Sequence, residues 1–195
     1  MEYYLFFDTE TNDVPLNYKA DANNVQSWPR LMELGFQIYN EHGELMTEQT
    51  MIIKPEGFDY IAPQASAIHG ITLEKANRVG VPLKYALNCF HNVKKFASKT
   101  IAYNMRFDKS VVNCEFIRSG KNGFDWSGEH CEMLKATDIL RIPNPHTWAT
   151  GYKWPSLLEY HEFCFDVGFD GAHSALADVQ AMADCFFHMK KVNEL

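Results

Sequence analysis

The 195-residue chain is 46% hydrophobic and 14% aromatic, which is typical of one globular domain with a sizeable core. Its formal net charge of -7 argues against a protein that holds nucleic acid through a broad basic surface, because such binding needs many Lys and Arg contacts to phosphates. No apolar run approaches the roughly 18 residues of a membrane span, so the composition gives no support for membrane insertion.

The first third of the sequence predicts three strands. Residues 3–7 form a short apolar and aromatic run, as in a strand buried on both faces. Residues 31–39 and 46–53 are predicted as further strands, with Gly43 in the turn between them. Residues 11–29 carry turn formers without a sustained period, which predicts a long loop, and such a loop beside a strand end is often functional.

The rest of the sequence alternates helix and strand. An amphipathic stretch over 82–96 predicts a helix, residues 100–103 a short strand, and 107–117 a second helix closed by Ser119-Gly120. A less regular region follows, and it contains residues 136–145. These elements predict an α/β protein.

The C-terminal part of the sequence predicts two more helices. One follows Pro155, and the other runs over 172–192. Apolar residues at helical spacing should form the buried stripe of this last helix, namely Val179, Met182, Phe186 and Met189. With no internal repeat, low-complexity tract or linker, residues 1–195 are expected to form a single domain.

Five widely spaced cysteines indicate a reducing compartment. They are odd in number and never form a Cys-x-x-Cys pair, which disfavours a disulfide framework and a zinc site. The N-terminus also enters its apolar run without the basic segment of a secretion signal. We therefore expect a cytoplasmic protein with no membrane partner.

A pair of carboxylates ends the first predicted strand. Asp8 and Glu10 lie two residues apart, so the period of a strand points both side chains to the same side, where they can share one cation. The Asp-x-Glu pattern alone is common on solvated surfaces. Its place at the end of a central, buried strand is where open α/β sheets bind ligands.

Two later segments carry polar residues at the start of a predicted helix. Asn104 can cap the helix that follows the strand over 100–103, and Asp108 falls in the first turn of that helix, where helix capping alone would also account for both residues. His173 and Asp178 lie five residues apart, a rotation of about 140° in a regular helix. They converge only if His173 lies on the segment leading into the helix while Asp178 projects from the helix itself.

Together, Asp8-x-Glu10, Asn104-x-x-x-Asp108 and His173-x-x-x-x-Asp178 resemble the motifs of the DEDDh 3′ to 5′ exonucleases, the family of the DnaQ proofreading exonucleases, RNase T and oligoribonuclease. The resemblance is greatest to stand-alone bacterial or phage members that are similar to the exonuclease domain of the DNA polymerase III ε subunit. The sister DEDDy group would place Tyr where this chain has Ser174. The resemblance also extends to Trp28-Pro29-Arg30-Leu31, Ile68-His69-Gly70-Ile71-Thr72 and Gly151-Tyr152-Lys153-Trp154-Pro155.

The resemblance implies an RNase H-like exonuclease fold with a central mixed sheet flanked by helices. It also implies two Mg²⁺ ions, roughly 3.5 to 4 Å apart, with Mn²⁺ as a substitute. Asp8 would bridge both ions, Glu10 and Asp178 would complete the first site, and Asp108 would support the second. Bound cations reverse the local sign of the charge, which reconciles an acidic chain with a phosphate substrate. An imidazole, with an ordinary pKa of about 6.5, suits His173 as the general base that deprotonates the attacking water.

The implied reaction releases nucleoside 5′-monophosphates from the 3′ ends of single-stranded or frayed DNA, with RNA as another candidate. In the family, the residues after the first acid contact the terminal 3′-hydroxyl, and Thr9, Glu10 and Thr11 hold those positions here. Terminal bases are commonly held by aromatic stacking. Three aromatic side chains are candidates, namely His69, Phe107 and Trp154, of which Trp154 is expected to serve packing; Asn104 is a further candidate for substrate binding.

Two other functions fit the same sequence features. One is a catalytically silent module that binds nucleic acid or another subunit, since a fold does not guarantee activity. The other is an RNase H-like endonuclease, which also uses clustered carboxylates and is told apart by product length. Discrimination of DNA from RNA depends on contacts to the 2′-hydroxyl, and association with a polymerase or as a homodimer stays open.

Overall fold

The computed structural model of the chain describes residues 2–145 and 150–192. Within these residues, a five-stranded sheet has the order β3-β2-β1-β4-β5. The central strand β1 pairs antiparallel with β2 and parallel with β4, so the sheet is mixed, as predicted. The strands are β1 (Tyr3–Thr11), β2 (Leu31–Asn40), β3 (Leu45–Ile52), β4 (Lys99–Ala102) and β5 (Glu129–Cys131).

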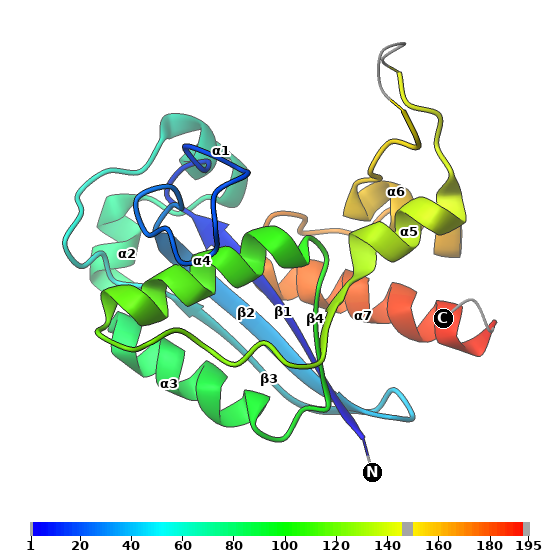
Figure 1. Cartoon of the computed structure of the whole chain (residues 1–195), viewed down its shortest axis with the longest axis horizontal. Coiled ribbons are helices and arrows are strands. Elements are labelled where there is room, and N and C mark those ends of the chain that lie inside the picture. The colour runs from blue at the N-terminus through cyan, green and yellow to red at the C-terminus, as the bar shows by residue number, and fades with distance from the viewer. Residues whose placement is uncertain (1, 146–149, 193–195) are drawn as a thin grey trace.

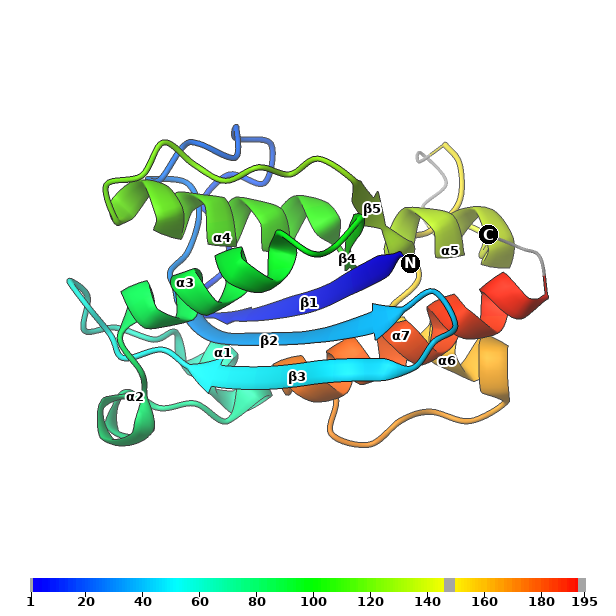
Figure 2. The ribbon, with the colours of Figure 1, turned by 90° about the horizontal axis from the view of Figure 1, so that it is seen from below.

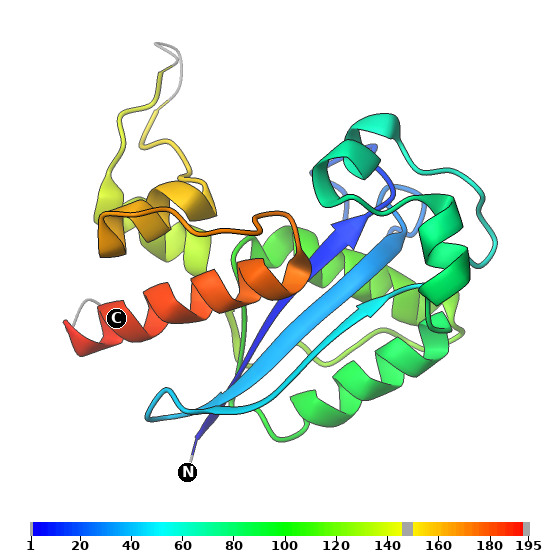
Figure 3. The same ribbon diagram turned by 180° about the vertical axis from the view of Figure 1, so that it is seen from behind.

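Helices cover both faces of the sheet. Helices α3 and α4 lie on one face and α7 crosses the other, with α6 packed outside α7 (Figures 2 and 3). Helices α1 and α2 lie beyond the carboxyl end of β1 (Figure 1). The helices are α1 (Pro63–His69), α2 (Leu73–Val79), α3 (Leu83–Lys94), α4 (Met105–Arg118), α5 (Glu132–Leu140), α6 (Leu157–Phe165) and α7 (Ala175–Lys191).

Side chains of β1 alternate between two hydrophobic cores. Leu5 and Phe7 pack with the apolar side chains of α3 and α4, whereas Phe6 packs with those of α7. Since side chains of a strand alternate with a period of two, Asp8 and Glu10 continue the row of Phe6 on the α7 side. The fold thus points both acids at the helix that carries the last predicted motif.

The elements predicted for the C-terminal part are confirmed in part. Helix α6 follows Pro155, and α7 buries all four residues of its predicted stripe. The prediction of an irregular region is wrong for residues 129–140, which form the short β5 and α5, whereas residues 141–145 lie in no helix or strand. The buried face of α5 includes Glu132, which accepts a hydrogen bond from the Tyr160 hydroxyl (2.9 Å), and this buried charge hides the apolar period of the helix.

Other predictions about the whole chain are also tested by the structure. All five cysteines are unpaired, which agrees with their spacing. Among residues 2–145 and 150–192, no helix is long and apolar enough to cross a membrane. The predicted long loop is present over residues 12–30, while Thr11 still belongs to β1.

Candidate active site

The site begins where β1 outlasts its neighbour β4. The two strands pair only as far as Phe6 and Ile101, so the backbone of β1 beyond has no strand on that side. Asp108, in the first turn of α4, takes its place: its Oδ1 accepts hydrogen bonds from the Thr9 amide (3.1 Å) and the Thr9 hydroxyl (2.7 Å). These bonds fix the Asp108 carboxylate beside the end of β1.

A glycine on β2 lets α7 approach the acids of β1. Gly35 lies opposite Asp8 in the antiparallel pair. A Cβ atom at Gly35 would lie 2.7 Å from the carbonyl carbon of Ala175, the first residue of α7, which is closer than real Cβ contacts allow. The absence of a side chain at Gly35 therefore permits the start of α7 to rest on the sheet next to Asp8.

Glu33 is a buried acid that the sequence analysis missed. It lies opposite Glu10 on β2, and its Oε2 accepts a hydrogen bond from the backbone amide of Ala175 (3.1 Å). The other oxygen, Oε1, accepts from the Thr50 hydroxyl (3.2 Å). Because Ser174 at the N-cap position makes no side-chain cap bond, Glu33 caps α7 instead. A lone acid within the apolar strand over 31–39 was the signal for this role.

His173 and Asp178 have the arrangement that their spacing required. His173 precedes α7 with a left-handed φ of 69°, while Asp178 projects from the first turn of the helix. The His173 backbone amide donates to Asp178 Oδ2 (3.1 Å), and this bond holds the turn. Glu10, His173 and Asp178 each offer a ligand atom within 4.8 Å of the others. This set of one nitrogen and two carboxylates could hold a divalent cation.

The carboxyl groups of the site destabilise one another's charged forms. Burial, followed by the charges of Asp108, Asp178 and Glu10, raises the pKa of Asp8 well above its usual range. Burial and the charges of Asp178 and Glu33 raise the pKa of Glu10 to about 8. Burial also raises the pKa of Asp178 to about 6. A bound cation would neutralise this repulsion, so the donor set fits a metal that prefers oxygen ligands.

Asn104 and Phe107 face the long loop. Asn104 holds the N-cap position of α4, but its side chain makes no cap bond; the prediction of a side-chain cap is therefore wrong. Its amide instead donates to the Tyr18 hydroxyl (3.4 Å). Phe107 stacks nearly parallel on the Tyr18 ring, with centroids 6.1 Å apart, and meets the Trp28 ring edge-on. Tyr18, which no sequence motif marked, thus lies among the residues that flank Asp108.

Three predicted candidates remain, namely Thr11, His69 and Trp154. The Thr11 hydroxyl donates to the Asp13 carbonyl (2.8 Å). His69 contacts the Thr11 carbonyl through Nε2 (3.1 Å) and accepts from the Ile71 amide through Nδ1 (3.0 Å), so backbone groups engage both ring nitrogens. Trp154 is 61% exposed, and the expectation that it serves packing is wrong.

A mixed sheet that gathers acids from β1, α4 and α7 at the carboxyl end of its central strand defines an RNase H-like nuclease. The comparisons with known proteins identify the family. The exonuclease model RNase T matches residues 5–186, so the chain belongs to this family of exonucleases. The resemblance to the DEDDh 3′ to 5′ exonucleases is thereby confirmed.

Solved structures of exonuclease I share the fold. One superposes with a TM-score of 0.76 at 19% identity, and a zinc-bound complex of the E. coli enzyme with single-stranded DNA gives 0.76 at 20%. A complex of the same E. coli enzyme with a dA16 oligonucleotide gives 0.75 at 20%. Each match covers 98% of this chain but 41% of exonuclease I, so the chain spans about two fifths of that protein. No curated protein matches the sequence.

Proposed function

We propose that residues 1–195 act as one exonuclease domain, which removes nucleotides from the 3′ end of single-stranded or frayed DNA and releases nucleoside 5′-monophosphates. The observation that carries this proposal is the convergence of Glu10, His173 and Asp178 within 4.8 Å, beside the half-buried Asp8. DNA is the proposed substrate, because DNA oligonucleotides occupy several of the exonuclease I structures. RNA is the second substrate to test.

The proposed cofactor is a pair of Mg²⁺ ions, for which Mn²⁺ is expected to substitute. Asp8, Glu10, Asp108 and Asp178 would hold them, because their mutual repulsion and buried oxygens suit hard cations. When bound, the ions supply charge that stabilises the attacking and leaving oxygens of an in-line displacement at phosphorus. The zinc-bound form of exonuclease I supports a divalent metal on this fold.

The chain's own residues would move the proton and hold the terminus. His173 has an exposed ring on a backbone fixed by Asp178, so it is placed to accept the proton of the attacking water. The backbone of Thr9 and the side chains of Glu10 and Thr11 would meet the terminal 3′-hydroxyl at the end of β1. Since all these groups come from one chain, the proposed site needs neither a polymerase subunit nor a second copy.

Removal of nucleotides from 5′-labelled single-stranded DNA and RNA tests the proposal. We expect a Mg²⁺-dependent ladder that shortens by single nucleotides and that EDTA abolishes. Asp8→Asn should lower the rate by more than about 100-fold, because changes to groups around metal ligands already cost about 10- to 100-fold. Asp125→Asn is the matched control, since this exposed carboxylate contacts only Ser127 and Lys94 among the described residues and is not one of the acids of the site.

The products separate the alternatives. Internal cuts would favour an endonuclease. If wild type binds both nucleic acids and cleaves neither, the silent module is the better account. Equal rates for wild type and Asp8→Asn would mean that any cleavage comes from a contaminant.

A further inference from the structure

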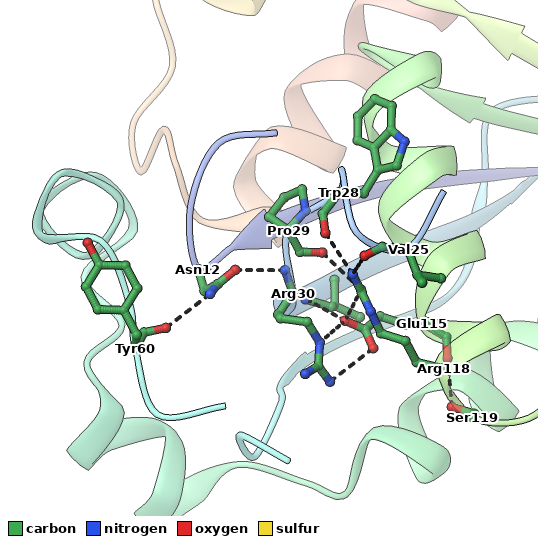
Figure 4. Close-up of polar contacts among 10 residues, drawn as sticks. Asn12, Val25, Trp28, Pro29, Arg30, Tyr60, Glu115, Arg118 and Ser119 are labelled. Atoms are coloured by element: carbon green, nitrogen blue, oxygen red, sulfur yellow. Dashed lines mark hydrogen bonds and ion pairs between the residues drawn. The ribbon is translucent and has the colours of Figure 1, made fainter. Parts of the chain in front are cut away.

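The long loop over residues 12–30 is fixed to α4 although it forms no helix or strand. Its carboxyl end is held by the buried Glu115 (Figure 4). One Glu115 oxygen accepts from Arg30 Nε (2.8 Å), the Leu31 amide (3.2 Å) and Arg118 Nη1 (2.9 Å). Arg118 also donates to the backbone carbonyls of the loop, among them that of Trp28 (2.7 Å).

Two neighbouring residues of α4, Asn113 and Cys114, hold the middle of the loop. The Asn113 amide donates to the Ala22 carbonyl (3.0 Å) and to Asn23 Oδ1 (2.9 Å). The Cys114 thiol also donates to the Ala22 carbonyl (3.2 Å). Buried side chains of α4 therefore hold this loop as a preformed wall beside the site.

Tyr18 lies where this wall meets the start of α4. Its carbonyl accepts from Arg106 Nε (3.1 Å), its hydroxyl accepts from Asn104, and one ring face stacks on Phe107. The residue is nevertheless 46% exposed. The stack on Phe107, the residue before Asp108, places the Tyr18 ring beside this acid. Burial, followed by the charge of Asp108, raises the pKa of the Tyr18 hydroxyl. A half-exposed aromatic ring is thus held rigidly beside the proposed reaction centre.

We propose that Tyr18 is a binding residue for the nucleic acid and that the part of its ring left exposed by Phe107 and Trp28 stacks on the base of the terminal nucleotide. This inference rests on the proposed function. Aromatic stacking accepts any base, because every base has a π-face. Tyr18 would therefore hold the terminal nucleotide without selecting its sequence. The fixed loop spares the cost of ordering the ring when substrate binds.

Removal of the terminal residue from two matched DNA strands tests the role of Tyr18. One strand ends in an ordinary nucleotide, and the other ends in an abasic tetrahydrofuran residue that keeps the phosphate and the 3′-hydroxyl. Tyr18→Ala should lower kcat/KM on the ordinary end by roughly tenfold or more and leave the abasic end unchanged. Tyr18→Phe should restore most of the loss, because it retains the ring.

Phe96→Ala is the control for removal of an exposed aromatic side chain. Phe96 is 74% exposed and lies just before β4, near the opposite end of β1 from Asp8. It should therefore leave both ends unaffected. A loss of equal size on the ordinary and abasic ends in Tyr18→Ala would overturn the stacking role while the exonuclease assignment stands.

A binding measurement separates the stacking role from catalysis. In the Asp8→Asn background, DNA with a 3′-terminal 2-aminopurine should lose fluorescence on binding, and the added Tyr18→Ala change should abolish that loss. If wild type cleaves nothing but this quenching depends on Tyr18, the proposed function fails and the stacking role stands. Quenching that persists without Tyr18 refutes the stacking role.

Discussion

The carboxyl groups of Asp8, Glu10 and Asp178 lie close enough that each resists ionisation of the others. Burial is the larger cause, because a charged carboxylate loses hydration when it leaves water. At neutral pH, ionisation of these carboxyl groups therefore lowers the stability of the metal-free protein. Binding of protons or cations to the carboxylates removes this loss. Perturbed groups of this kind cluster at functional sites.

Stability in EDTA is expected to fall as pH rises from about 4.5 to about 8. Over this range the folded protein holds protons on Glu10 and Asp178, whose pKa values are raised to about 8 and about 6, while the unfolded chain has released them. The free energy of unfolding therefore decreases with pH, by about 1.4 kcal/mol for each pH unit over which one proton separates the two states. Thermal melts across this range measure the slope.

Glu10→Gln tests whether Glu10 causes this pH dependence of stability. It removes the ionisable group of Glu10 and keeps its shape, so it should raise the melting temperature in EDTA at pH 8 and flatten the pH dependence while abolishing exonuclease activity. Added Mg²⁺ should stabilise wild type more at pH 8 than at pH 5.5, because cations and protons compete for the same oxygens. If stability falls equally with pH in wild type and in Glu10→Gln, groups other than Glu10 cause the pH dependence.

At the scale of elements, the start of α7 is seated by two residues of β2. Gly35 provides clearance for Ala175, and Glu33 accepts the Ala175 amide. The distance between the acids of β1 and Asp178 is therefore set by the packing of a helix end on a strand. The motifs in the sequence identify Asp8, Glu10 and Asp178. Residues of β2 determine how far Asp178 lies from the two acids of β1.

Gly35→Ala is expected to lower both stability and activity. The added methyl must displace the backbone of Ala175, and overpacking of this kind costs about 1 to 3 kcal/mol. Because Asp178 and His173 follow this shift, kcat should fall by about tenfold or more. Urea unfolding and the ladder assay measure the two effects.

Gly168→Ala is the control for Gly35→Ala. There the one close contact of the new Cβ is with the end of the flexible Leu158 side chain, at 2.9 Å, while Glu162 Oε1 lies at an ordinary 3.8 Å. Stability and kcat should therefore stay near those of wild type. A Gly35→Ala protein with unchanged kcat would show that the seating of α7 does not set the site.

At the scale of the whole molecule, one buried carboxylate joins three distant segments. Glu115 on α4 binds Arg30 at the end of the long loop and the amide of Leu31 at the start of β2. The Arg30 guanidinium also lies 4.5 Å from the centroid of the Phe58 ring, in the segment before α1. The carboxylate of Glu115 thus holds both the long loop beside the site and the start of β2 in the central sheet.

Glu115→Gln should destabilise the whole domain. Removal of one partner from a buried ion pair costs about 3 to 5 kcal/mol, and here the partly buried guanidinium groups of Arg30 and Arg118 would both lose their charged partner. Glu129→Gln removes an exposed pair with Lys109 and should cost no more than about 1 kcal/mol. Urea unfolding compares the two, and equal losses would mean that Glu115 behaves as a surface group.

The sequence by itself determined the family, the α/β class, the central strand and the residues of the proposed catalytic set. It could do so because alternating and helical apolar periods are local, and because the spacings Asp8-x-Glu10 and His173-x-x-x-x-Asp178 constrain which side chains can meet. The last helix was predicted to begin at residue 172, but α7 begins at Ala175, so His173 precedes it and meets the condition for convergence with Asp178.

Only the tertiary structure decided what holds this set in place. Glu33, Gly35 and Tyr18 act through neighbours that are distant in sequence, namely the start of α7 for the two β2 residues and the start of α4 for Tyr18. The sequence failed to predict the short β5 and helix α5 for the same reason, since β5 exists through pairing with β4 and α5 buries Glu132 against Tyr160. Contacts between distant segments leave no periodic pattern in a sequence, so their partners appear only once the chain is folded.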